Sequence, residues 1–227
     1  METRYLKKVS FLSELSQANL KLLTRIAKKL TCKKGEEIFS ISSSGQTLYI
    51  VTSGKIKIFT SSPSGKTKVL DYLERGDFFG EMSLLDQETR SASACALVDS
   101  ELITINRKDF QKLLKNQPDL ALSFLRVLCN RLRRADKEIE ALTFQNVLGR
   151  IAIILLDFAD RYGKETPEGI CLDTDFTHLD LAQLAGTARE MITRIITRFK
   201  KTGCIQLNEQ TKRVTIIDRD KLKSFIY

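Results

Sequence analysis

Hydrophobic residues in the stretch Pro118–Asn146 recur in alternating steps of four and three. The recurring positions are Ala121, Leu125, Leu128, Leu132, Ala135, Ile139 and Leu142. Heptads of this kind predict a long helix that packs against a copy of itself, with these residues as the dimer interface. The alternative is a core helix within one globular domain. The hydrophobic period differs on the two sides of the stretch, which favours a dimerisation helix joining two domains.

Upstream of this helix, β-branched and aromatic residues gather in short runs. The runs are Glu37–Ile41, Thr47–Val51, Lys55–Thr60, Thr67–Tyr72 and Leu102–Ile105. Glycines fall between them at intervals of roughly ten residues, a pattern typical of an antiparallel β-roll, or double-stranded jelly roll. Helical spacing over residues 5–30 and Asn106–Asn116 predicts a helix on each side of the roll.

Downstream of the long helix, the pattern changes back to helical spacing. It predicts a hinge at Val147–Arg150, a helix over Ile151–Tyr162 and a loop over Gly163–Gly169. Further on, two short apolar runs, Ile205–Leu207 and Val214–Ile217, predict a two-stranded wing.

Between that loop and the wing, Thr177–Arg194 has the pattern of a helix, a glycine-containing turn and a second helix. Thr177 suits the N-cap of the first helix and Gly186 suits the turn. The second helix is expected to direct Met191, Ile192, Ile195 and Ile196 into the core. Its outward side chains are then Thr187, Arg189, Glu190, Thr193, Arg194 and Arg198.

An outward face of this composition suits DNA. Arginine can read guanine and glutamate can accept from cytosine when a second helix enters the major groove. Lysines and arginines near the helix end and the wing suit phosphate contacts, and these are Lys200, Lys201, Lys212 and Arg213. The plainer interpretation is a solvated charged face, as on any amphipathic helix.

Composition narrows the class of protein. The 227 residues carry a net charge of +9, which fits an anionic partner without locating it. The sequence has no apolar run long enough for a membrane span and no signal-peptide pattern at its start, so a cytoplasmic protein is expected. Its five cysteines are dispersed, which argues against a disulfide framework and against a metal-ligand cluster.

One stretch of the predicted roll breaks the strand pattern. It runs from Gly76 to Leu85 and continues, after a gap, as Thr89–Ala94. Glycines and small residues allow the backbone to approach a ligand closely. Arg90 would then meet a phosphate and Glu81 a sugar hydroxyl. A Glu81–Arg90 salt bridge that braces the loop is the alternative.

These residues also carry a resemblance. The segments FGEMSLL and RSASA resemble the phosphate-binding cassette of cyclic-nucleotide-binding β-rolls. Together with the long helix and the REMITR segment, the whole chain resembles the cyclic-AMP receptor protein/FNR family of bacterial transcription regulators. The resemblance implies that Glu81 holds the ribose 2′-hydroxyl and that Arg90 and Ser91 hold the cyclic phosphate. The implied effector-binding residues are Gly80, Glu81, Met82, Ser83, Arg90, Ser91, Ala135 and Asp136.

The resemblance also sets the expected architecture and partners. The fold class is α+β, with a β-roll effector domain (1–117), a dimerisation helix (118–146) and a winged helix-turn-helix DNA-binding domain (147–227). The expected partners are a second copy of the chain, a pseudo-palindromic double-stranded DNA site and RNA polymerase. No enzymatic activity is expected.

Departures from the family pattern bear on the effector. Cys32 stands alone in the N-terminal region, so no iron–sulfur cluster is expected. The single histidine, His178, lies in the predicted DNA-binding motif and does not suit a haem ligand. Ala135 and Asp136 align with the Thr-Ser pair that contacts adenine in the cyclic-AMP receptor protein, so the hydroxyls that favour cyclic AMP are missing.

Several effector hypotheses therefore stay open. Cyclic AMP or cyclic GMP is the leading effector, and an effector other than a nucleotide, including a haem or redox signal, or ligand-independent activity is the alternative. A cupin-like metalloenzyme is a remote alternative, because residues 1–150 contain no histidine to bind a metal. The target promoters and the choice between activation and repression do not follow from the sequence.

Overall fold

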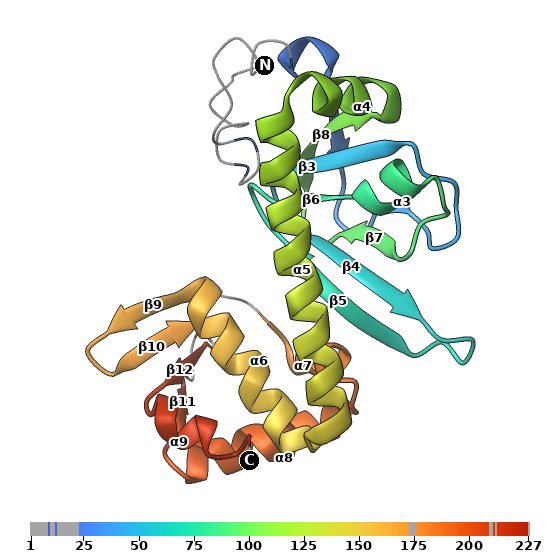
Figure 1. Cartoon of the computed structure of the whole chain (residues 1–227). Helices are drawn as coiled ribbons and strands as arrows, with labels where there is room; N and C mark the ends of the chain where they lie inside the picture. The colour runs from blue at the N-terminus through green and yellow to red at the C-terminus, as the bar shows by residue number, and fades with distance from the viewer. Residues whose placement is uncertain are drawn as a thin grey trace. The chain divides into compact units, whose positions relative to one another are not determined.

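A computed structural model describes residues 9, 12, 23–172, 176–208, 211 and 213–226 (Figure 1). Most of the helix predicted over residues 5–30 lies outside these residues. Within them, residues 23–26 are helical, whereas Lys28–Leu30 belongs to the strand β1. The chain divides into two compact units, Met1–Arg133 and Arg134–Tyr227, so the long helix contributes to both.

The first unit contains the predicted β-roll, built from two four-stranded antiparallel sheets. One sheet has the order β1-β8-β3-β6 and the other the order β2-β7-β4-β5. Their strands are β1 (Lys28–Cys32), β8 (Ser100–Asn106), β3 (Thr47–Ser53), β6 (Phe78–Phe79), β2 (Glu37–Phe39), β7 (Ser93–Ala96), β4 (Ile56–Ser61) and β5 (Thr67–Leu73). The sequence pattern did not predict β1, β6 or β7.

The β1-β8-β3-β6 sheet is buried on both faces. Val51 and Leu102 belong to a cluster that also contains residues of the second sheet. Their neighbours Ile50 and Ile103 belong to a different cluster, which includes residues of the helices that follow the roll. Since successive strand residues point to opposite faces, this sheet is covered on one side by its partner sheet and on the other by helices.

Helices α3 (Glu81–Asp86) and α4 (Arg107–Asn116) lie in the first unit, and α5 (Pro118–Phe144) starts in it. The short helix α3 interrupts the roll, and α4 starts where the Asn106 side chain accepts from the backbone N–H of Asp109. The long helix α5 begins at its proline, as predicted. Its residues Leu120 and Phe124 are buried against the roll core.

The break after α5 lies earlier than the sequence suggested. Helix α6 (Val147–Tyr162) already includes Val147–Arg150, so the hinge predicted there is wrong. The interruption falls at Gln145–Asn146, because the Asn146 side chain caps α6 by accepting from the N–H of Gly149 at 3.0 Å.

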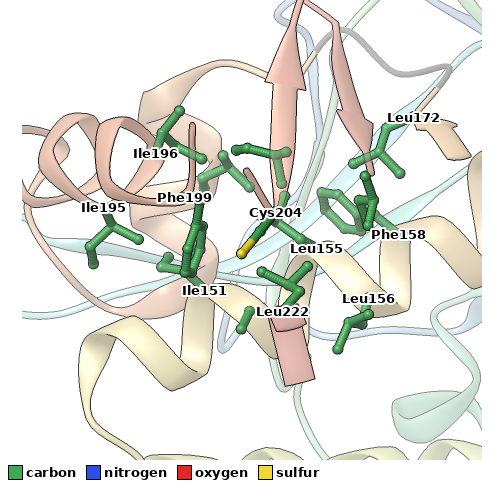
Figure 2. Close-up of a cluster of buried hydrophobic side chains, with 14 of the residues drawn as sticks. Ile151, Leu155, Leu156, Phe158, Leu172, Ile195, Ile196, Phe199, Cys204 and Leu222 are labelled. Atoms are coloured by element: carbon green, nitrogen blue, oxygen red, sulfur yellow. The ribbon is translucent and has the colours of Figure 1, made fainter. Parts of the chain in front are cut away.

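The second unit is a helix-turn-helix with a small sheet. Helices α6, α7 (His178–Ala185), α8 (Arg189–Lys201) and α9 (Arg219–Lys223) accompany a sheet of order β11-β12-β10-β9. Its strands are β11 (Ile205–Leu207), β12 (Val214–Ile216), β10 (Gly169–Leu172) and β9 (Gly163–Thr166). Figure 2 shows the core that they enclose, in which Ile151, Leu155, Phe199 and Cys204 are nearly inaccessible to solvent.

The hairpin β9–β10 replaces the loop predicted over Gly163–Gly169. Strand β10 pairs with β12, and β9 is then added as an edge strand next to β10. Within the turn, the Thr166 hydroxyl donates to the carbonyl of Gly169 at 2.8 Å. The glycines and Pro167 made this segment look like a loop in the sequence. The hairpin forms because β10 pairs with the distant strand β12, not because its strands have a hydrophobic pattern of their own.

Candidate functional site

The candidate effector site is formed by β6, α3 and the segment that leads into β7. Gly80 caps α3 in the left-handed conformation, with φ of 80°. A Cβ at Gly80 would lie 2.6 Å from Nη1 of Arg90 and 2.9 Å from the carbonyl oxygen of Thr47. Glycine is therefore required at this position both by backbone conformation and by space.

Arg90 is the central cation of this site, and it is only 4% exposed. Its Nη1 donates to the Gly80 carbonyl and to the Ser83 hydroxyl, both at 2.8 Å, and its Nη2 donates to the Thr47 carbonyl at 3.0 Å. The Arg90 Nε is buried without a hydrogen-bond partner. These described hydrogen bonds all end on neutral oxygens, and burial lowers the pKa of Arg90.

Glu81 does not form the salt bridge with Arg90 that the sequence left open. Glu81 as a whole residue is 6% exposed, and its carboxylate accepts from Nη1 of Arg131, on α5, at 2.8 Å. Arg131 also donates to the Phe78 carbonyl and lies over the Phe78 ring, 4.3 Å from its centroid. The long helix is therefore joined directly to the cassette within the first unit.

A second arginine, the half-buried Arg107, also contacts the cassette. Its Nη2 donates to the carbonyls of Gly45 and Ser83, at 2.9 and 2.7 Å. Ser83 is thus bound by Arg90 through its hydroxyl and by Arg107 through its carbonyl. Sequence reasoning missed Arg107 and Arg131, because their partners lie far away in the chain.

Aromatic rings line the site beside Arg90. The guanidinium carbon lies 4.2 Å from the centroid of the Phe39 ring. Tyr49 and Phe79 are stacked with ring centroids 5.0 Å apart, and Phe39 contacts both rings. The buried cation is therefore flanked by flat apolar surfaces.

The remaining predicted effector residues are more exposed. Met82 is 53% exposed, and its sulfur accepts from the Ser91 hydroxyl at 3.3 Å. Ala135 and Asp136 are exposed on the part of α5 that belongs to the second unit. Their role towards an effector stays a prediction.

The candidate DNA-binding face lies on α8. Buried residues Ile192, Ile195, Ile196 and Phe199 seat the helix, whereas Met191 is 38% exposed, so its predicted place in the core is wrong. Met191 adjoins the outward face of the helix, beyond the apolar stripe. The side chains exposed on α8 include Arg189, Glu190, Thr193, Arg194, Thr197, Arg198, Lys200 and Lys201. Thr187, in the turn, is half-buried, and Lys212 lies outside the described residues.

Two contacts of α8 residues lie near this face. Nδ1 of His178, at the start of α7, lies 3.0 Å from the Thr193 hydroxyl on α8. Burial and the charge of Arg189 lower the pKa of His178. The guanidinium carbon of Arg198, on α8, lies over the Phe225 ring, 5.6 Å from the ring centroid.

The long helix carries an exposed apolar stripe. Leu125, Leu132, Ile139 and Leu142 of the predicted seam are 53%, 64%, 62% and 47% exposed. Leu122, at 54%, and the exposed Cys129 extend the stripe, whereas Leu128 is half-buried against the roll core. Ala121 is half-buried and Ala135 is exposed.

Comparison with known proteins matches each unit to a domain family. Residues 29–117 match the cyclic nucleotide-binding domain, and residues 149–225 match the Crp-like helix-turn-helix domain. The chain is 37% identical over 181 residues to the cyclic AMP receptor protein of Thermus thermophilus, covering 80% of this chain and 81% of that protein. The chain belongs to the cyclic-AMP receptor protein/FNR family of transcription regulators.

Other members of the cyclic-AMP receptor protein/FNR family agree with this assignment. The CRP-like cAMP-activated global transcriptional regulator of Mycobacterium tuberculosis is 32% identical over 200 residues, or 88% of each chain. A CooA mutant from Carboxydothermus hydrogenoformans has the same fold, with a TM-score of 0.81 at 22% identity over 94% of this chain and 92% of that one. The protein is therefore a DNA-binding transcription regulator with an effector-binding domain, and the α+β architecture predicted from the sequence is confirmed.

Two further observations concern membranes and metals. No helix in the described part of the chain combines the length and the apolar character that a membrane crossing requires. Among the same residues, histidine, cysteine, aspartate and glutamate form no group of three or more that could hold a metal ion.

Proposed function

We propose that the protein is a homodimer whose affinity for specific DNA is set by a small anionic effector held at the cassette. Cyclic AMP or cyclic GMP is the leading effector. The observation that carries this proposal is Arg90, a guanidinium that is 4% exposed and whose described hydrogen bonds end on neutral oxygens. A buried cation without a direct anionic partner is stabilised when a phosphate supplies the missing charge.

The neighbouring groups suit the rest of a cyclic ribose phosphate. The Glu81 carboxylate uses Oε1 for Arg131, and its second oxygen can accept from a ribose hydroxyl. The Ser91 hydroxyl donates to a weak acceptor, the Met82 sulfur, which a phosphate oxygen would replace favourably. Two relatives, one named a cyclic AMP receptor protein and one named a cAMP-activated regulator, support a nucleotide in the same domain.

The base of the nucleotide is expected to be selected in part by α5. Asp136 cannot donate a hydrogen bond, but its carboxylate can accept from N1–H and N2–H of guanine. It cannot satisfy N6 and N1 of adenine together. Cyclic GMP should therefore bind no more weakly than cyclic AMP.

On the DNA side, α8 is the proposed recognition helix. Arg189, Glu190 and Arg194 are exposed in its first two turns, where side chains reach base edges in the major groove. Lys200 and Lys201 are exposed at its end and suit phosphate contacts. Two copies would read a pseudo-palindromic site with half-sites one DNA turn, about 34 Å, apart. A cytoplasmic location and RNA polymerase as a further partner follow from this role.

The second copy is proposed to pack on the exposed stripe of α5. Leu125, Leu132 and Ile139 are each more than half exposed in one protomer and follow heptad spacing. Isolated large apolar side chains on a surface are common, but a row of them along one helix indicates a partner helix.

Calorimetric titration with each cyclic nucleotide tests the effector proposal. Wild type should release or absorb heat with at least one of them, and Arg90→Leu should lose binding. Asp136→Ala should remove any preference for cyclic GMP. A strong preference for cyclic AMP that survives Asp136→Ala would refute guanine recognition, and no heat from either nucleotide would assign the site to another effector class.

A further inference from the structure

Gly45, just before β3, is a buried residue that faces the Arg90 side chain. A Cβ built on Gly45 would overlap Nε of Arg90 and the Ser83 hydroxyl, and it would lie 2.6 Å from Cζ of Arg90. Carbon atoms that are not bonded pack at about 3.5–4.0 Å. Any other side chain at position 45 would therefore need space that the Arg90 guanidinium and the Ser83 hydroxyl fill.

The backbones on both sides are fixed, so neither can move away to make room. Ser42 N–H donates to the Arg90 carbonyl and Arg90 N–H donates to the Ser43 carbonyl, both at 2.8 Å. Ser44 and Thr89 form an antiparallel bridge next to these bonds. A larger residue at position 45 would consequently displace side chains, namely the Ser83 hydroxyl and the Arg90 guanidinium, and two of the three nearest atoms belong to Arg90.

Arg107 also holds the backbone of Gly45 and Ser83 in place. Its Nη2 donates to the carbonyl of Gly45 at 2.9 Å and to the carbonyl of Ser83 at 2.7 Å. Both carbonyls are thereby held while the Ser83 hydroxyl accepts from Arg90. Gly45 and Ser83 together form one wall of the slot that holds the guanidinium.

Gly80 also borders the guanidinium, since a Cβ there would lie 2.6 Å from Nη1 of Arg90, but substitutions at the two glycines test different things. Gly80 has a φ of 80°, so any substitution there also strains the backbone. Gly45 is not among the described residues with positive φ, so alanine fits its backbone conformation. Substitution at Gly45 therefore tests the space alone.

We propose that Gly45 is a positioning residue for effector binding, because its missing side chain is what allows Arg90 to lie against the carbonyls of Gly80 and Thr47. The effector part of this inference rests on the proposed function. If position 45 carried a side chain, the Arg90 guanidinium would lose its hydrogen bonds to these carbonyls and its charge would lie away from the cassette.

A double-mutant cycle in thermal unfolding tests the geometry without any ligand. Wild type, Gly45→Ala, Arg90→Ala and the double variant are compared, with Gln46→Ala as the control at the exposed neighbouring position. Gly45→Ala should lower the unfolding midpoint more in the presence of Arg90 than when Arg90 is alanine, because in the second background only the overlap with the Ser83 hydroxyl remains. Gln46→Ala should have the same small effect in both backgrounds. Equal effects of Gly45→Ala in the two backgrounds would overturn the proposal.

Calorimetry with cyclic AMP and cyclic GMP on the same variants tests the consequence. Gly45→Ala should weaken the nucleotide that wild type binds by at least about tenfold, the loss expected for hydrogen bonds to a charged group. Unchanged affinity would overturn the positioning role. Absence of binding to wild type would refute the nucleotide as effector, whereas the unfolding cycle would still decide whether Gly45 seats Arg90.

Discussion

The Glu81–Arg131 ion pair lies at the contact between the cassette and α5, and its two side chains differ in burial. The Glu81 side chain is 8% exposed and that of Arg131 is 29% exposed. Glu81→Gln should destabilise the protein by about 1–3 kcal/mol, because it leaves a half-buried guanidinium without its anion.

The exposed pair Lys29–Glu101 is the matched control for that substitution. Its side chains are 60% and 46% exposed, so Glu101→Gln should cost less than about 1 kcal/mol. Denaturant unfolding measures both variants. Similar losses in the two would show that burial of Glu81 adds nothing to the ion pair.

His178 gives the DNA-binding unit a defined pH dependence. Burial and the charge of Arg189 lower its pKa below the ordinary value of 6.5, so the unfolded chain binds the proton more readily. The facing groups are Thr193 and Arg189 of α8, with Asp180 following on α7 itself. The contribution of neutral His178 to the free energy of unfolding is complete above the pKa of this histidine in the unfolded chain. It is lost as the pH falls through the pKa of His178 in the folded protein.

The unfolding midpoint should be lower at pH 5.5 than at pH 7.5, two values roughly one unit below and above the ordinary histidine pKa. His178→Gln should flatten this dependence, because most carboxylates stay ionised over the same interval. Thermal unfolding by circular dichroism checks both. Parallel pH profiles for wild type and His178→Gln would contradict the assignment.

Among the elements, the first helix of the helix-turn-helix has a complete capping box. The Thr177 hydroxyl accepts from Asp180 N–H at 3.2 Å, and the Asp180 carboxylate accepts from Thr177 N–H at 2.8 Å. Thr177→Ala should therefore cost about 1 kcal/mol. Thr143→Ala is the control within a helix, where the Thr143 hydroxyl donates only to the carbonyl of Ile139. Equal stability of the two variants would show that the cap is unimportant.

The long helix carries the prediction of oligomeric state. Leu132 is 64% exposed, and Leu132→Lys would place like charges opposite one another in an apolar seam, so the variant should sediment as a monomer. Leu70→Lys is the control, since Leu70 is 43% exposed on β5 and does not belong to the apolar stripe of α5. A dimer that persists in Leu132→Lys would place the interface elsewhere.

Elements with a strong period of their own were predictable from the sequence, and those held by distant partners were not. The alternating residues of β3 and the heptads of α5 are patterns within one stretch of sequence, so they predict a strand and a helix without knowledge of distant contacts. The two-residue strand Phe78–Phe79 exists because it pairs with β3, and β9 exists because β10 pairs with β12. In the site, Glu81 and Arg90 were found from their motif, but Arg131 is 50 residues from Glu81 in the chain.

The proposed regulation requires the effector site of the first unit to act on the DNA-binding face of the second. Arg131 connects the cassette to α5, and α5 contributes residues to both units. An effector can change DNA affinity only by its differential affinity for two states of the dimer. Nucleotide binding and the change in DNA affinity that it causes should therefore depend on the same residue, Arg90.

The most direct test is DNA affinity measured with and without cyclic nucleotide, on a site selected from random DNA by the wild-type dimer. Fluorescence anisotropy should show at least a fivefold change in wild type, the lower end of about 5–150-fold for coupled sites. Arg90→Ala should bind the same DNA without responding to either nucleotide. Equal wild-type affinity in the presence and absence of both nucleotides would contradict the account.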